Sequence, residues 1–328
     1  MGLRQWSIVW CIAVLACAVA EERPVAALTS LPGIPVLGPP EGTPAVSVTW
    51  YGVSTLLFDD GETKVLTDGF FSRPLFEDLE SIAEPDTAQI ARLVETADLH
   101  DLAMITAVHS HFDHAMDVGV VALATGATVF GSESTANVAR GAGVDESRIV
   151  VVDDRRTERY GDFAVTLIRS AHLPLEDGGP PIPGTIDAPL VPPAPIGAWK
   201  EGGSYTVLIE HPAGTAVVQG SAGYIEGGLD DVTADVVYLG VGGVGIPGKE
   251  HVGSYFEEVV RATGAGCARP VHWDDFNRPF GEIAFMRDRE RAEEGIAWVR
   301  EFAAAGDRPV WLATLPFGQA VDAFAGCD

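Results

Sequence analysis

Six consecutive residues of this sequence concentrate side chains that bind metal ions. Residues 109–114 read His-Ser-His-Phe-Asp-His, which places three of the chain's eight histidines beside an aspartate. His109 and His111 point to the same side if the backbone is extended, because the side chains of a strand alternate. Asp113 and His114 follow where the chain turns into a predicted helix. Neutral imidazole and carboxylate are ligands for zinc and other divalent first-row ions, so the pattern predicts a metal site.

Alternating strands and helices are expected to position this run. Periodicity predicts strands at 46–58 (a pair), 64–67, 102–108, 128–130, 149–152, 163–168, 205–209, 215–218, 236–239, 270–271 and 310–315, and helices at 87–96, 116–124, 134–140, 252–261 and 287–304. They form two successive halves, separated by a Pro-rich segment at 173–203. We therefore predict one α/β domain with two central sheets and outer helices.

The run at 109–114 matches the HxHxDH signature of the metallo-β-lactamase superfamily, and the chain resembles that superfamily over nearly all of 46–319. Asp68 matches an early acidic position, His172 the third histidine and His272 the last. In detail the motif is most similar to the branch of ascorbate-6-phosphate lactonase-like proteins and N-acylphosphatidylethanolamine phospholipases. The resemblance implies an αββα sandwich, which agrees with the two predicted halves.

The resemblance also implies two sets of metal ligands. His109, His111 and His172 would form one site, and Asp113, His114 and His272 the other. The chain departs from the family pattern at Ser221, which stands where an aspartate usually bridges the two metals. A neutral hydroxyl is a weak bridging ligand, so we expect one tightly bound divalent ion and a second, weaker one. Zinc is the expected metal, with manganese and iron left open.

The expected function is metal-dependent hydrolysis of a small-molecule substrate. A metal-activated water would attack a lactone, ester or phosphodiester, and Asp113 would orient it and accept its proton. The alternative is a catalytically weak, metal-stabilised binding protein of the cell envelope, degraded at Ser221. Residues 240–245 fit G-x-G-x-x-G, but no helix follows directly, so dinucleotide binding is not expected.

Several further residues carry weaker expectations. The segment 173–203 directly follows His172, so we predict that it borders the active site, with Trp199 and Tyr205 either contacting substrate or packing in the core. Asp68 is expected to support a ligand rather than to bind metal. We expect one of Asp274 and Asp275 to orient His272. His251 is expected to be structural. His100 and His211 are expected to lie in surface loops.

Composition and charge restrict the class of protein. The chain has 328 residues, of which 47% are hydrophobic and 21% charged, which excludes disorder as the main state. Its net charge of -26 excludes nucleic-acid binding through a basic surface and disfavours charge-driven binding to anionic membranes.

The first 45 residues are expected to lie outside the hydrolase domain, which would span 46–328. Residues 1–20 resemble an export leader, which predicts a periplasmic, envelope-anchored or secreted protein. Cleavage before Glu21 and a bacterial lipobox that leaves a lipidated Cys17 are both open, and the lipid would be the only membrane attachment. Residues 21–45 would form a Pro-rich linker. Cys267 and Cys327 allow one disulfide, or both stay unpaired.

Overall fold

Two seven-stranded sheets form the centre of the molecule. The computed structural model describes residues 29–175, 178–286 and 291–327, so the predicted leader and residues 287–290 of the predicted helix lie outside the described residues. The first sheet has the order β16-β1-β2-β3-β5-β6-β7, with β1 (Ser47–Trp50), β2 (Leu56–Asp59), β3 (Lys64–Thr67), β5 (Leu102–Thr106), β6 (Thr128–Gly131), β7 (Ile149–Val151) and β16 (Ala320–Asp322). The second has the order β15-β14-β13-β12-β11-β9-β8, with β8 (Arg156–Tyr160), β9 (Phe163–Ser170), β11 (Ser204–His211), β12 (Gly214–Gln219), β13 (Val236–Gly240), β14 (Cys267–Val271) and β15 (Trp311–Leu312). A small third sheet pairs β4 (Ile82–Ala83) with β10 (Ala194–Pro195).

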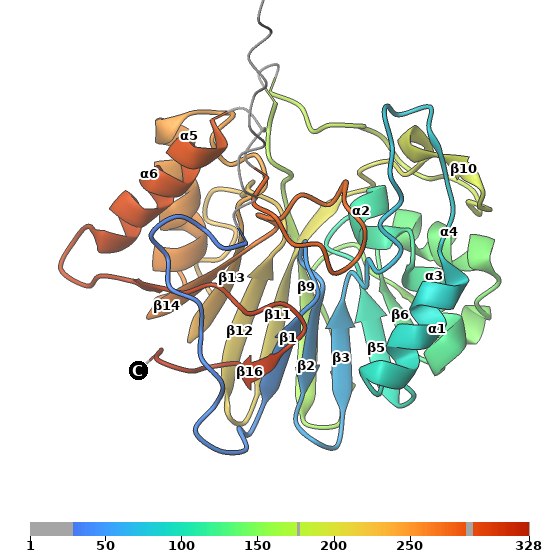
Figure 1. The fold of residues 1–328 in the computed structure, drawn as a ribbon, viewed down its shortest axis with the longest axis horizontal. Helices are drawn as coiled ribbons and strands as arrows, with labels where there is room; N and C mark the ends of the chain where they lie inside the picture. Colours follow the sequence, from blue (N-terminus) through green and yellow to red (C-terminus); the bar gives the residue numbers. More distant parts are fainter. Residues whose placement is uncertain (1–28, 176–177, 287–290, 328) are drawn as a thin grey trace, which may run out of the picture.

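Helices cover the outer faces of both sheets (Figure 1). The first sheet is covered by α1 (Thr87–Thr96), α3 (Val118–Thr125) and α4 (Glu133–Ala142), and the second by α5 (Lys249–Phe256) and α6 (Ala292–Ala304). The shorter helical turns are α2 (Phe112–Ala115), η1 (Glu146–Arg148), η2 (Ile196–Ala198) and the π-helical η3 (Glu257–Arg261). This αββα arrangement is the predicted one. No helix within the described ranges is long and apolar enough to cross a bilayer.

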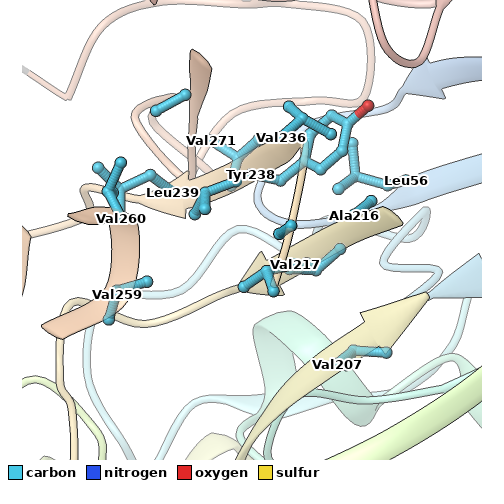
Figure 2. Packing of buried hydrophobic residues seen from close by; sticks show 14 of the residues in the cluster. Leu56, Val207, Ala216, Val217, Val236, Tyr238, Leu239, Val259, Val260 and Val271 are labelled. Atoms are coloured by element: carbon cyan, nitrogen blue, oxygen red, sulfur yellow. The ribbon is translucent and has the colours of Figure 1, made fainter. Parts of the chain in front are cut away.

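The strands of the first sheet are apolar on both faces because both faces are covered. In β2, Leu56 and Phe58 face the core between the sheets, whereas Leu57 joins the core under the outer helices. The same apolar cluster includes Tyr238 of β13, whose ring contacts Phe58 of β2, and reaches Val260 of η3 (Figure 2). This alternation follows the two-residue period of a strand, and it holds the two sheets face to face.

Part of the predicted linker packs onto the domain. Leu31 and Ile34 are buried in the inter-sheet core. The Leu37 N–H donates to the Thr314 carbonyl, and the Thr314 N–H donates to the carbonyl of Pro35. Residues 29–37 are therefore fixed against the C-terminal part of the chain.

A disulfide joins Cys267, the first residue of β14, to Cys327, and it closes a separation of 60 residues. Of the two alternatives for these cysteines, one disulfide or two unpaired thiols, the structure shows the disulfide.

Candidate metal centre

The predicted ligands gather at one end of the two sheets, although they come from three separate segments of the chain. His109 follows β5, and His111, Asp113 and His114 lie in or next to α2, which Figure 1 places at the upper edge between the sheets. The second sheet contributes His172 after β9 and His272 after β14. Each sheet thus supplies part of the site from its strand ends.

His109, His111 and His172 form one compact group in which the candidate ligand atoms all lie within 4.8 Å of one another. Hydrogen bonds orient two of the rings. His111 donates through Nε2 to the Pro181 carbonyl at 2.9 Å, and His172 donates through Nδ1 to the Leu173 carbonyl at 2.9 Å. Since a carbonyl only accepts, these bonds leave His111 Nδ1 and His172 Nε2 with free lone pairs for a metal ion.

Asp113, His114 and His272 form a second group with the same spacing. Asp113 Oδ2 lies 3.6 Å from His114 Nε2 and 3.4 Å from His272 Nε2. His114 Nδ1 lies 2.9 Å from Asp68 Oδ2, and the other carboxylate oxygen of Asp68 accepts from the Val108 N–H. Asp68 therefore orients His114 and leaves its Nε2 free, which is the supporting position expected from the sequence.

The two groups adjoin each other and contain buried nitrogen atoms without a hydrogen-bond partner. The His109 and His114 ring centroids are only 4.0 Å apart. Both ring nitrogens of His109, Nε2 of His114 and Nδ1 of His272 find no hydrogen-bond partner among the described residues. Such orphaned polar atoms are rare in folded proteins and call for a ligand. The donor set of five imidazoles and one carboxylate fits a pair of divalent first-row ions.

Burial keeps the first group in the protonation state that a metal needs. Burial, and then the neighbouring histidines, hold the pKa of His109 well below its usual value; burial also lowers the pKa of His111 and lowers that of His172 to about 3. Neutral imidazole has the free lone pair that a metal ion requires.

In the second group, Asp113 and His114 stabilise each other's charged form. Burial favours neutral His114, but Asp113 and Asp68 outweigh it and raise the pKa of His114. Burial also opposes charge on Asp113, yet His114 and His272 hold the pKa of its carboxyl below the usual range. A charged carboxylate is therefore present where a second ion would bind.

The backbone of His272 has a positive φ of 57°, which is uncommon for a residue other than glycine. Its N–H donates to the Val53 carbonyl, and the Val53 N–H donates to Asp274 Oδ1. Asp274 in turn forms a fully buried ion pair with Arg73 at 2.7 Å. Asp274 thus fixes the segment that holds the His272 backbone and leaves the His272 ring untouched, while Asp275 pairs with Arg278 instead.

Gly242, in the run at 240–245, allows the His272 ring to approach closely. A Cβ atom at this position would lie 2.7 Å from His272 Nδ1, which is shorter than real contacts allow. No helix follows the run directly, because α5 begins only at Lys249. Gly242 therefore serves the packing around the metal centre.

Ser221 lies in the loop after β12, and its hydroxyl accepts the Leu173 N–H at 2.9 Å. This bond ties the loop to the residue that follows His172. His251 donates to the neighbouring Ala222 carbonyl at 2.7 Å, in agreement with its expected structural role.

The structure decides the alternative left open for Trp199 and Tyr205, and it contradicts the expectation for His211. Trp199 is completely buried in the core under the outer helices, and Tyr205 is buried with its hydroxyl on the Val152 and Asp153 carbonyls, so the described contacts place neither in the site. His211 ends β11 with its side chain nine-tenths buried against Phe163, because that ring fills the space beside the hairpin. His100, by contrast, is exposed as expected.

His211 also lies in a third group of candidate ligands, with Asp60 and Asp162. Its Nδ1 accepts the Ala213 N–H, so a neutral ring carries its proton on Nε2, 3.4 Å from Asp60. That proton leaves no lone pair for a metal, and we assign the group a structural role.

The segment 173–203 borders the site as predicted. Leu173, Leu175, Pro181 and Ile182 line a cavity together with His111, Asp113, His172 and His272. The bond from His111 to the Pro181 carbonyl attaches the segment directly to a candidate ligand.

Comparison with known proteins supports the fold. No protein-family model matches the sequence, and no curated protein is similar to it. The structure resembles CmlA, a diiron β-hydroxylase from Streptomyces venezuelae, with a TM-score of 0.54, 13% identity and coverage of 86% of this chain and 55% of that one. It resembles an isothiocyanate hydrolase from Delia radicum gut bacteria with a TM-score of 0.50, 15% identity and coverage of 84% and 98%. It also resembles the metallo-β-lactamase fold protein YhfI from Bacillus subtilis, with a TM-score of 0.49, 13% identity and coverage of 84% and 99%.

The chain is an α/β protein with two large sheets flanked by helices. The predicted α/β fold class with two central sheets and outer helices is confirmed, and the superfamily and the branch within it stay predictions.

Proposed function

We propose that this protein is a metal-dependent hydrolase that cleaves a lactone, carboxylic ester or phosphodiester with a metal-activated water. The observation that carries the proposal is the pair of adjoining ligand groups with buried, unpartnered ring nitrogens beside a cavity. Divalent ions bound there would lower the pKa of a water molecule and polarise the oxygen of the scissile group.

The side chains of this chain would supply orientation and proton transfer. Asp113 is charged, borders the cavity and lies between His114 and His272, so it is placed to orient the attacking water and to accept its proton. Because the histidine rings are held by Pro181, Leu173 and Asp68, the ligand geometry is set before substrate binds.

Zinc is the metal that we propose, since imidazole and carboxylate ligands around an open position suit it. CmlA is a diiron protein, so iron belongs in the same test. Ser221 offers no carboxylate, and we propose one tight ion and one weaker ion.

We further propose that the protein is exported and that its substrate is a small molecule. The disulfide supports export, because disulfides persist in oxidising compartments. Mass analysis of the mature N-terminus would distinguish a start at Glu21 from a lipidated Cys17. An intact, uncleaved chain in the cytosol would contradict export.

The proposed hydrolysis is tested with the purified protein loaded separately with Zn²⁺, Fe²⁺ and Mn²⁺. Each form is assayed against neutral lactones, carboxylic esters, phosphodiesters and, because one protein of similar fold hydrolyses them, isothiocyanates. We expect metal-dependent turnover that His109→Ala abolishes, whereas His100→Ala, at an exposed histidine, retains it. Tight metal binding without turnover on any class would instead favour the metal-stabilised binding protein.

A further inference from the structure

A cavity of about 420 Å³ adjoins the metal centre, and its walls are largely apolar. It lies within the size range of small-molecule sites. Three phenylalanines form one wall: Phe112 lies 5.0 Å from Phe76 and 6.0 Å from Phe276 between ring centroids. Phe276 also contacts the His272 ring at 5.6 Å. The aromatic wall therefore begins directly at a candidate metal ligand.

The opposite wall comes from the segment 173–203. Leu175 and Ile182 line this space, the apolar cavity. The Ile182 carbonyl accepts the Glu201 N–H, and the preceding Pro181 is bonded to His111. These bonds fix the wall relative to the metal centre, so the cavity has a defined shape.

Charge is nearly absent from this lining. Apart from the histidine ligands, Asp113 is the only ionisable side chain among the described residues that line the apolar cavity, and no described lysine or arginine reaches it. Among the described lining residues, a phosphate or carboxylate remote from the scissile bond finds no cationic partner, while the net charge of -26 repels it. The lining therefore favours a substrate that is uncharged beyond its reacting group.

The apolar surface continues from the cavity to the solvent. Leu79 and Leu175 line the cavity and are 46% and 37% exposed. Exposed leucines gathered at the mouth of one apolar cavity indicate a path along which an apolar group leaves the site.

We propose that the apolar cavity binds the uncharged acyl chain of a neutral carboxylic ester or lactone, with the scissile carbonyl at the metal centre. This inference rests on the proposed hydrolysis and specifies its substrate class. Phe76, Phe112 and Phe276 contact the chain near the carbonyl, and Leu79 and Leu175 contact its far end. Hydrolysis breaks the acyl C–O bond and water supplies the new oxygen. An ester gives a carboxylic acid and an alcohol, and a lactone gives one hydroxy acid.

The test measures kcat/KM of the metal-loaded protein on p-nitrophenyl esters of acetate, butanoate, hexanoate and octanoate. Each added methylene buried in the cavity should raise kcat/KM by about two- to fourfold until the cavity is filled. A matched substrate, the mono-p-nitrophenyl ester of adipic acid, has the chain length of hexanoate with a terminal carboxylate. We expect kcat/KM at least about tenfold lower for this substrate, because the carboxylate loses its hydration without gaining a partner. No dependence on chain length, or a preference for the adipate ester, would overturn the inference.

Two variants test whether the preference for uncharged acyl chains arises in the apolar cavity. Leu175→Lys should lower the ratio of octanoate to adipate ester kcat/KM by about tenfold or more, since it places a cation at the cavity mouth. Leu123→Lys is the control, because Leu123 is similarly exposed at 44% but lies in α3, away from the cavity. An equal change in both variants would overturn the assignment of the cavity.

A binding measurement separates this inference from the proposed function. Octanamide should raise the melting temperature of the protein more than butanamide does, and Leu175→Lys should remove the difference. Chain-length-dependent binding without hydrolysis of any ester would contradict the hydrolase and retain the cavity assignment. Hydrolysis without chain-length dependence in either measurement would contradict the cavity assignment alone.

Discussion

Asp68 shows how a single side chain outside the ligand set controls the candidate centre. Its carboxylate bonds His114 Nδ1, the Ser54 hydroxyl and the Val108 N–H. Asp68→Asn should weaken metal binding at the Asp113–His114–His272 group by about 10- to 100-fold, because the amide no longer fixes the ring and its tautomer. Competition with a chromophoric chelator measures this affinity. Asp275→Asn, a partly exposed carboxylate near His272, is the control and should leave it unchanged.

Ser221 provides the corresponding prediction for the missing bridging carboxylate. Ser221→Asp should raise occupancy of the weaker site, because a negative charge between two dications offsets their repulsion. Ser221→Asn has nearly the same shape without the charge and should not raise it. Metal titration followed by elemental analysis compares the three proteins. Two equally tight ions in the wild-type protein, with no gain in the aspartate variant, would mean that another group replaces the missing aspartate.

Asp117 links stability to pH. It is buried at the start of α3 and accepts hydrogen bonds from the Phe71 and Ser72 N–H groups and the Ser72 hydroxyl. Burial raises the pKa of Asp117 from 3.8 to about 6, although these hydrogen bonds oppose the change. Between these values the folded state binds more protons than the unfolded state, so the contribution to stability is full below pH 3.8 and is lost as the pH rises through about 6.

The expected loss in free energy of unfolding across this window is about 3 kcal/mol. Asp117→Asn does not titrate and should lack this slope. Urea unfolding at intervals from pH 4 to pH 7 measures both proteins, and the wild-type minus variant difference should fall with rising pH. A constant difference would show that Asp117 ionises in the folded protein as it does in the unfolded chain.

At the scale of elements, the disulfide ties β14 to the C-terminal segment. Residues 267 and 327 are joined across a separation of 60 residues. Replacing both cysteines with serine should lower the free energy of unfolding by about 2–4 kcal/mol, because the unfolded chain regains conformational freedom. Denaturant unfolding of the oxidised protein and the double variant provides the measurement. Equal stabilities would mean that hydrogen bonds and packing alone hold the C-terminal segment.

Elements with a strong apolar pattern could be predicted from the sequence. The helix at 87–96 coincides with α1, and the predicted hairpin around His211 is formed by β11 and β12. Of the four edge strands of the two large sheets, β7 and β15 could be predicted, whereas β8 and β16 could not. β8 is mostly polar and partly exposed, and β16 has three residues that pair with β1 from the opposite end of the chain. Their partners, rather than their own patterns, make them strands.

The same distinction applies to the candidate site. The histidine-rich run at 109–114 could be found because its residues are contiguous. The Pro181 carbonyl on His111 and the Val53 carbonyl on the His272 N–H could not, because any residue offers a carbonyl and only long-range packing selects these two. Trp199 and Tyr205 were ambiguous for a similar reason: an aromatic side chain near a site packs equally well in a core.

At the scale of the whole molecule, Arg73 and Asp274 join a loop of the first sheet to a loop of the second. Both side chains are fully buried. Arg73→Met should destabilise the protein by about 3–5 kcal/mol, since it leaves a buried carboxylate without its cation. Adding Asp274→Asn should recover part of this loss. Urea unfolding of both variants measures the effect, and a single variant as stable as the wild type would show that other groups compensate the charge.

The division of ligands between the sheets has a consequence for the order of events during synthesis. His109, His111, Asp113 and His114 leave the ribosome first, but neither three-residue group is complete without a residue that follows a strand of the second sheet. His172 completes one group, and His272, near the end of the chain, completes the other. A chain translocated unfolded would therefore acquire both ions only after it has crossed the membrane, so the metal supply of the receiving compartment would decide which ions it carries.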